Sequence, residues 1–98
     1  MPGISSRVTE LWEVVGEYDV EIEGLERTLK IKVKKIISSD SKYTFVGETN
    51  LKVKGTGLGD FYQSLAPQLT REAALQDAIQ GFLKFYSEDA VIQEVKNW

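Results

Sequence analysis

The sequence predicts an α+β fold in which a three-stranded antiparallel β-meander is packed on one face by a helix over about residues 70–86. Apolar and charged residues alternate with a period of two through the first half of the chain, which is typical of half-buried strands. Towards the end the apolar residues recur at helical spacing. With 98 residues, of which 42% are hydrophobic, the chain is expected to form a single domain over residues 1–98, with residues 1–10 flexible.

The first strand is expected in "WEVVGEYDVEIE", beginning near Trp12 or Val14. Its odd positions are mostly acidic, and its even apolar positions are Trp12, Val14, Tyr18, Val20 and Ile22. This alternation predicts that one face of the strand is buried and the other solvated. The residues before the strand also fit helical spacing, so a short extra helix could lie at this terminus.

The next two strands are expected in "TLKIKVKKII" and "YTFVGETNLKVK". The connections "GLER" and "SSDSK" are short and rich in turn-forming residues, which favours an antiparallel meander. A four-residue loop at 24–27 would place Val20 opposite Ile31 on the apolar face. On the solvated face the same register pairs Glu21 with Lys30, Asp19 with Lys32 and Glu17 with Lys34. These acids are expected to neutralise most of the lysine charge.

The helix is expected to follow Thr70 as its N-cap, with Glu72 in the first turn. Its apolar stripe consists of Ala74, Leu75, Ala78, Ile79, Phe82, Leu83 and Tyr86. Gly81, inside the helix, predicts a close approach to the sheet or a kink. After Ser87 a second short helix is expected, with an edge strand as the alternative.

The segment 55–69 is expected to be a long loop. It begins "GTGLGD", but Asp60 stands where a dinucleotide-binding loop needs a glycine, and Pro67 separates the glycines from the helix. The loop is unusually apolar, and its apolar residues either fold back over the core or bind a partner. The candidate partner-binding residues are Leu58, Phe61, Tyr62, Leu65 and Trp98.

The chain contains no histidine and no cysteine. The usual general base near neutral pH and the thiol nucleophile are therefore missing, so no catalytic residue, metal ligand or cofactor is expected. The absence of cysteine, of an apolar run long enough to span a membrane and of a secretory signal favours a cytoplasmic protein without membrane contact.

The leading hypothesis is a small non-catalytic protein-interaction or assembly module, with a homodimer as one form. Strands of about 12 residues run roughly 40 Å, whereas a helix of about 17 residues covers roughly 25 Å. The apolar face near Trp12 and Tyr43 therefore needs another cover, which could be the C-terminal segment, the long loop or a second copy of the chain.

Two alternatives stay open. The first is nucleic-acid binding, which is made less favourable by the net charge of −3 and would use a small patch formed by Lys35, Lys42, Lys52 and Lys54. The second is a small-ligand pocket lined by Tyr18, Tyr43, Phe45 and Phe82, aromatic residues that more often belong to a core.

The order of a meander followed by a helix resembles the double-stranded-RNA-binding domain, as does the helix "EAALQDAIQGFL". The resemblance implies phosphate contacts from a basic cluster at the start of that helix. Here the corresponding stretch is "LTREAAL", in which Arg71 stands beside Glu72, so the sequence departs from the family at its functional position.

Overall fold

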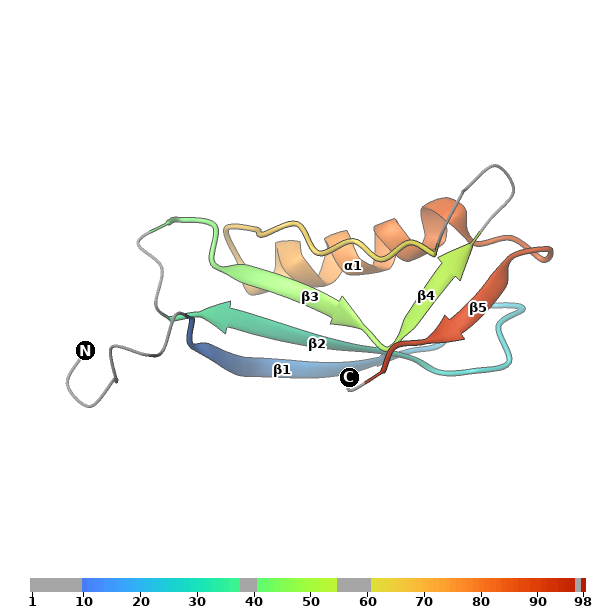
Figure 1. Ribbon diagram of the computed structural model, residues 1–98, viewed down its shortest axis with the longest axis horizontal. Helices are drawn as coiled ribbons and strands as arrows, with labels where there is room; N and C mark the ends of the chain where they lie inside the picture. The colour runs from blue at the N-terminus through green and yellow to red at the C-terminus, as the bar shows by residue number, and fades with distance from the viewer. Residues whose placement is uncertain (1–9, 38–40, 55–60, 97) are drawn as a thin grey trace.

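A computed structural model of the chain describes residues 10–37, 41–54, 61–96 and 98. The elements in chain order are β1 (Trp12–Val20), β2 (Leu29–Ile36), β3 (Phe45–Thr49), β4 (Leu51–Lys54), α1 (Arg71–Phe85) and β5 (Val91–Glu94). β1, β2 and β3 form an antiparallel sheet in that order, while β4 pairs with β5 (Figure 1). The predicted α+β fold, a three-stranded meander with a packed helix, is confirmed.

The helix lies where the periodicity predicts it. Its first turn is capped by Thr70, whose Oγ1 accepts a hydrogen bond of 3.0 Å from the backbone N–H of Ala73. Glu72 in the first turn and Lys84 in the last turn carry the charges that the helix dipole favours at each end. The helix ends at Phe85, one residue before the expected boundary.

The core lies between the sheet and α1, which packs mainly on β3 and β2. We call this face of the sheet the inner face and the opposite one the outer face. The buried apolar cluster consists of Leu29, Ile31, Val33, Leu51, Val53, Ala74, Ala78 and Phe82. Full burial of a large aliphatic or aromatic side chain is worth ~1.5–3 kcal/mol, so this cluster is the main source of stability.

The third strand is not continuous, which corrects the expectation of one strand over 43–54. It is interrupted at Asn50, whose backbone N–H donates to the carbonyl of Lys30 on β2 at 2.9 Å. The carbonyl of Asn50 accepts from the N–H of Val95, just after β5, at 2.8 Å. β2 and β5 therefore diverge from this one residue, and the sheet divides into two parts (Figure 1).

The side chain of Asn50 holds this junction together. Its Oδ1 accepts from the backbone N–H of Lys30 at 2.8 Å, and its Nδ2 lies 3.4 Å from the carbonyl of Thr28. Asn50→Ala should lower the free energy of unfolding by about 0.5–1.5 kcal/mol, because the exposed Lys30 N–H exchanges its protein partner for water. Chemical denaturation followed by circular dichroism measures this. Gln93→Ala on exposed β5 is the control, and equal stability of the two variants would contradict the role of Asn50.

The C-terminal segment forms a strand, β5. The prediction of a second short helix after Ser87 is therefore wrong, and the alternative of an edge strand is confirmed. β5 satisfies one edge of β4, whose backbone groups need hydrogen-bond partners. Ile92 packs against the core while its neighbours Val91 and Gln93 are exposed. At the other terminus, the flexibility expected over residues 1–10 and the start of the possible helix fall mostly on residues 1–9, which lie outside the described residues. From Trp12 onwards the chain is a strand rather than a helix.

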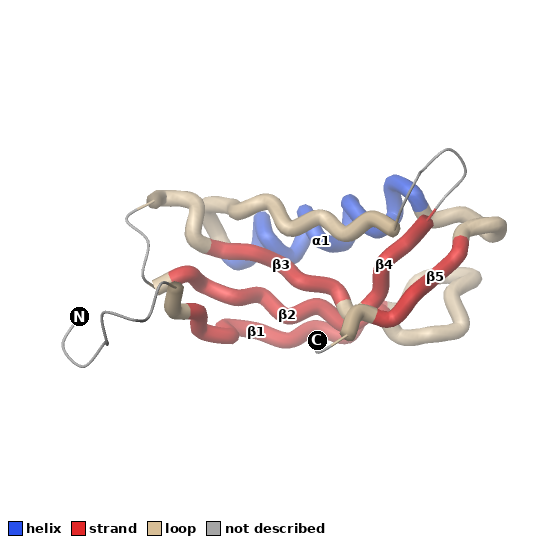
Figure 2. Tube along the Cα trace, in the orientation of Figure 1, coloured by secondary structure: helices blue, strands red, loops and turns tan. Residues whose placement is uncertain are grey.

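Of the expected long loop, residues 61–69 are described, and 61–68 form an extended segment beside β3 and β4 (Figure 2). Tyr62 and Val53 exchange two backbone hydrogen bonds of 3.1 and 2.7 Å, and Gln68 and Phe45 do the same at 2.7 and 3.1 Å. The segment therefore covers the edge of the sheet that faces away from β2. The glycine-rich stretch 55–60 lies outside the described residues.

Gly81 marks a close approach, as expected, but to the segment 61–68 rather than to the sheet. A Cβ atom at Gly81 would lie 2.6 Å from the Cβ of Ser64. Next to this contact the Ser64 hydroxyl donates to the carboxylate of Asp77 at 2.6 Å. The glycine thus allows the helix and the extended segment to pack without a gap.

The register of the first hairpin differs by two residues from the expected one. Val20 pairs with Leu29 and Asp19 with Lys30, so the connection spans 21–28 rather than 24–27. One contact and one backbone conformation accompany the longer turn: Thr28 Oγ1 donates to Glu21 Oε1 at 3.2 Å, and Gly24 adopts a φ of 86°. A shift of two keeps the side chains of β2 and of residues 16–20 on their expected faces.

Candidate association surface

A β-bulge interrupts β1. The register of β1 against β2 shifts between Val14, which pairs with Lys34, and Gly16, which pairs with Val33. Val15 is therefore an extra residue without a partner across the ladder. One inserted residue reverses the alternation of side chains between the two faces. The same face of β1 therefore carries even-numbered residues before the bulge and odd-numbered residues after it.

The bulge moves the side chains at the start of β1 to the face opposite the expected one. Val14 shares the outer face with its neighbour Lys34, and Trp12 shares it with its partner Ile36. The alternation of the sequence predicts Trp12 and Val14 on the buried face together with Tyr18, and this prediction is wrong. The physical reason is the bulge, for which Gly16 within a strand pattern is the available sequence signal.

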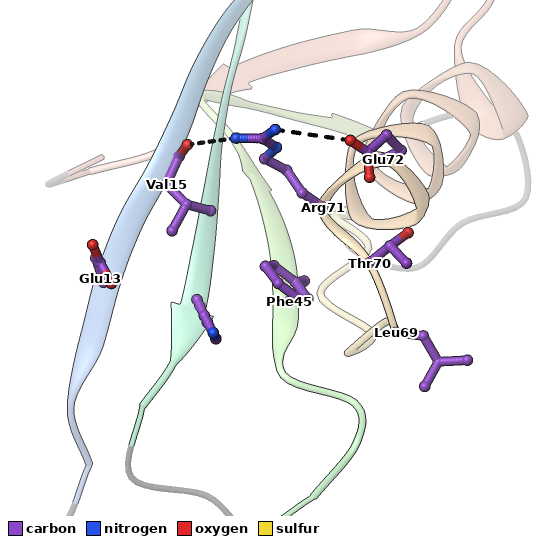
Figure 3. A pocket seen from close by; sticks show the side chains of 8 residues that line it. Glu13, Val15, Phe45, Leu69, Thr70, Arg71 and Glu72 are labelled. Carbon is purple, nitrogen blue, oxygen red and sulfur yellow. Dashed lines mark hydrogen bonds and ion pairs between the residues drawn. The ribbon is translucent and has the colours of Figure 1, made fainter.

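Contacts from α1 and from β1 itself hold the bulge. The carbonyl of Val15 lies 3.4 Å from Nη1 of Arg71, which reaches across from the first turn of α1 (Figure 3). A Cβ atom at Gly16 would lie 2.8 Å from the ring of Tyr18. A larger residue at position 16 would therefore displace this aromatic ring, so the glycine fits the close contact.

Four apolar residues lie around Lys34 on the outer face at this end of the sheet. They are Trp12, Val14, Ile36 and Val46, and we call them the outer strip. Trp12 is 37% exposed and Val14 is 50% exposed, whereas Ile36 is half-buried and Val46 is buried. An open apolar surface thus lies on the face where the alternation of β1 predicts mostly acidic residues.

Charged groups border the outer strip. Lys34 Nζ forms an ion pair of 3.0 Å with Glu48 Oε2, with both side chains more than two-thirds buried. Lys34 is thus paired with β3 rather than with the expected Glu17. Farther along, Lys32 Nζ lies 4.2 Å from the ring centroid of Trp98, whose indole N–H donates to the carbonyl of Glu48 at 2.8 Å.

The candidate partner-binding residues do not form one surface. Trp98 lies on the outer face, since the ammonium group of Lys32 projects from that face over its ring. Tyr62 is half-buried on the helix side, where its ring meets that of Phe85 edge-on at 4.6 Å. Phe61 is half-buried too and Leu65 is 49% exposed. Leu58 lies outside the described residues.

The four lysines of the nucleic-acid hypothesis lie at separate places. Lys35 is near the end of β2 and Lys42 follows shortly after it, at one end of the molecule. Lys52 and Lys54 belong to β4, which runs to the opposite end (Figure 1). The structure therefore does not bring these residues together into one basic patch.

A hollow of about 410 Å³ opens on the inner face between β1 and the start of α1 (Figure 3). Its lining includes two acidic and two basic side chains, Glu13, Glu72, Lys35 and Arg71. Of the aromatic residues expected around a ligand, only Phe45 lines it. Phe82 is buried in the core and Tyr43 is 53% exposed, so the expected aromatic pocket is not assembled.

Within the described part of the chain, no cluster of three or more acidic side chains is arranged to hold a metal ion. None of the helices in this part is both long and apolar enough to span a membrane.

Comparison with models of protein families, with curated proteins and with solved structures found no match to this chain. The resemblance to the double-stranded-RNA-binding domain therefore gains no support from these comparisons.

Proposed function

We propose that this protein is a small non-catalytic assembly module of the cytoplasm, which forms a homodimer through the outer strip. The observation that carries the proposal is the outward position of Trp12 and Val14 beside Ile36. Contiguous apolar surface with an exposed tryptophan is typical of protein contact sites, where aromatic residues supply much of the binding free energy.

A second copy of the chain fits this surface because of how its charges are arranged. An interface with two-fold symmetry uses the same surface on both subunits, so it must be complementary to itself. The outer strip is apolar, and the ion pair of Lys34 with Glu48 beside it supplies both signs of charge. Two copies can therefore bury Trp12 while placing acids of one subunit near lysines of the other.

The sequence gives the same proposal a second support. The absence of histidine and cysteine from the chain removes the side chains that most often perform acid–base and nucleophilic catalysis near neutral pH. The C-terminal segment and the long loop are two of the three covers expected for the open apolar surface. Trp98 lies on the outer face near Lys32, and the segment 61–68 covers an edge of the sheet. Trp12 stays exposed and is available to a second copy.

Trp12→Asp should convert the dimer to a monomer. A charge placed at the centre of an apolar interface loses its hydration, and loss of a buried tryptophan anchor alone typically costs about 2 kcal/mol or more, roughly 30-fold in the dimer dissociation constant. Sedimentation equilibrium over a range of concentrations measures this constant.

Leu83→Asp is the matched control. Leu83 is 44% exposed and lies on α1, away from the outer face, so this variant should dimerise like the unmodified protein. A protein that is monomeric at every concentration, or two variants that weaken the dimer equally, would contradict the proposal. Retention on nucleic acid that falls steeply with salt would instead support the lysine alternative.

A further inference from the structure

β1 forms a free edge of the sheet. It is nine residues long and pairs with β2 on one side, while within the described residues no strand pairs with its other side. Such an edge presents backbone N–H and C=O groups that can bind another strand. The bulge at Val15 twists the edge, which limits regular pairing to the stretch 16–20.

The side chains along this stretch alternate between acidic and apolar. Glu17 and Asp19 are exposed on the outer face, and Tyr18 and Val20 are half-buried on the inner face. The ion pairs found among the described residues involve Lys34, Arg27 and Arg71 and leave out both of these acids. The two carboxylates are therefore available to a cation that approaches along the edge.

We propose that the edge of β1 binds an extended basic peptide by strand addition. Main-chain hydrogen bonds to β1 supply affinity, and the alternating side chains of the bound segment supply specificity. Lysine or arginine at every second position of the peptide would lie beside Glu17 and Asp19 on the outer face. Apolar residues between them would continue the inner face beside Tyr18 and Val20.

The charges on β1 disfavour a second copy of β1 at this edge. Antiparallel pairing of two β1 strands over 16–20 brings Glu17 and Asp19 close to the same acids of the other copy. Like charges directly opposite one another destabilise a strand pair. β2 has the required lysines, but both of its edges are already paired, with β1 and β3. The occupant is therefore a basic segment of another protein.

A seven-residue synthetic peptide of alternating lysine and valine tests this proposal by isothermal titration calorimetry. We expect saturable binding to the full chain that weakens as salt is added. Glu17→Lys together with Asp19→Lys should weaken binding about tenfold or more, because two favourable cross-strand charge pairs become repulsive. The same double variant should bind the corresponding peptide of alternating glutamate and valine.

Two controls separate strand addition from general charge attraction. Glu88→Lys together with Asp89→Lys makes the same change of charge in an exposed turn and should leave peptide binding within about twofold. The lysine–valine peptide N-methylated at every residue keeps its charge but has no backbone N–H to donate to β1, so it should not bind. Equal binding of the N-methylated peptide, or equal loss in both double variants, would overturn the proposal.

This proposal and the proposed dimer can fail separately, because they use different surfaces. Trp12→Asp changes the outer strip, which lies on the other side of the bulge from 16–20. It should therefore dissociate the dimer and leave peptide binding intact. Loss of peptide binding in a Trp12→Asp protein that is still folded would show that the edge is not an independent site.

Discussion

Gly47→Val is expected to lower the free energy of unfolding by about 3 kcal/mol or more. Gly47 is buried on β3 where α1 crosses the sheet, and a Cβ atom there would lie 2.5 Å from the carbonyl oxygen of Ala74 and 2.9 Å from the Cβ of Ala78. Overpacking of a core typically costs ~1–3 kcal/mol. The cost here lies at or above that range because the nearest atom belongs to the helix backbone and cannot rotate away.

Urea denaturation followed by far-ultraviolet circular dichroism measures the effect. Gly47→Ala adds one methyl group at the same place and should have a smaller effect in the same direction, because the helix must still shift. If Gly47→Ala were as stable as the unmodified protein, α1 would not approach β3 as closely as the structure describes.

Phe82→Ala should destabilise the protein by about 3–5 kcal/mol, the usual cost of removing a buried phenylalanine ring and leaving a cavity. Phe82 is 2% exposed, and its ring stacks on that of Tyr86 with centroids 5.5 Å apart. Since small domains are stable by only about 5–15 kcal/mol, the variant should have little stability left.

The neighbouring residue provides the control for this variant. Leu83 is 44% exposed, so Leu83→Ala should change the unfolding free energy by no more than about 0.5 kcal/mol. A thermal unfolding series compares the two variants under one condition. Equal midpoints for Phe82→Ala and Leu83→Ala would mean that the helix presents a different face to the sheet.

Elements whose signals are local could be predicted from the sequence. The helix and its Thr70 cap follow from periodicity and from one side-chain oxygen, both of which act within a few residues. β2 follows from strict alternation, since Leu29, Ile31 and Val33 are all buried as expected. The helix, its cap and the buried face of β2 do not depend on which other segment of the chain packs against them.

Features that depend on distant partners could not be predicted in the same way. The strand break at Asn50 requires both Lys30 and Val95 to reach the same residue. β5 has only four residues, too few for an alternating pattern to distinguish a strand from a helix. The register of the first hairpin depends on turn contacts such as that of Thr28 with Glu21, which a count of loop residues does not reveal.

The outer strip is the clearest case of a feature that depends on residues distant in the sequence. Strict alternation assigns Trp12 to the buried face, because it takes Val15 to be an ordinary strand position. The bulge is held in part by Arg71, which is 56 residues away in the sequence from Val15. Gly16 is the one local hint, and it indicates where a bulge could form without showing which side chains it would turn outwards.

The central claim is that Trp12 is the centre of the contact between two copies, and the two tryptophans of the chain allow a direct test. In two-dimensional NMR spectra of the isotope-labelled protein at increasing concentration, the indole N–H signal of Trp12 should shift or broaden as the dimer forms. That of Trp98, held by its 2.8 Å hydrogen bond to Glu48, should move less. A Trp12 signal that stays constant while the measured mass doubles would contradict the account.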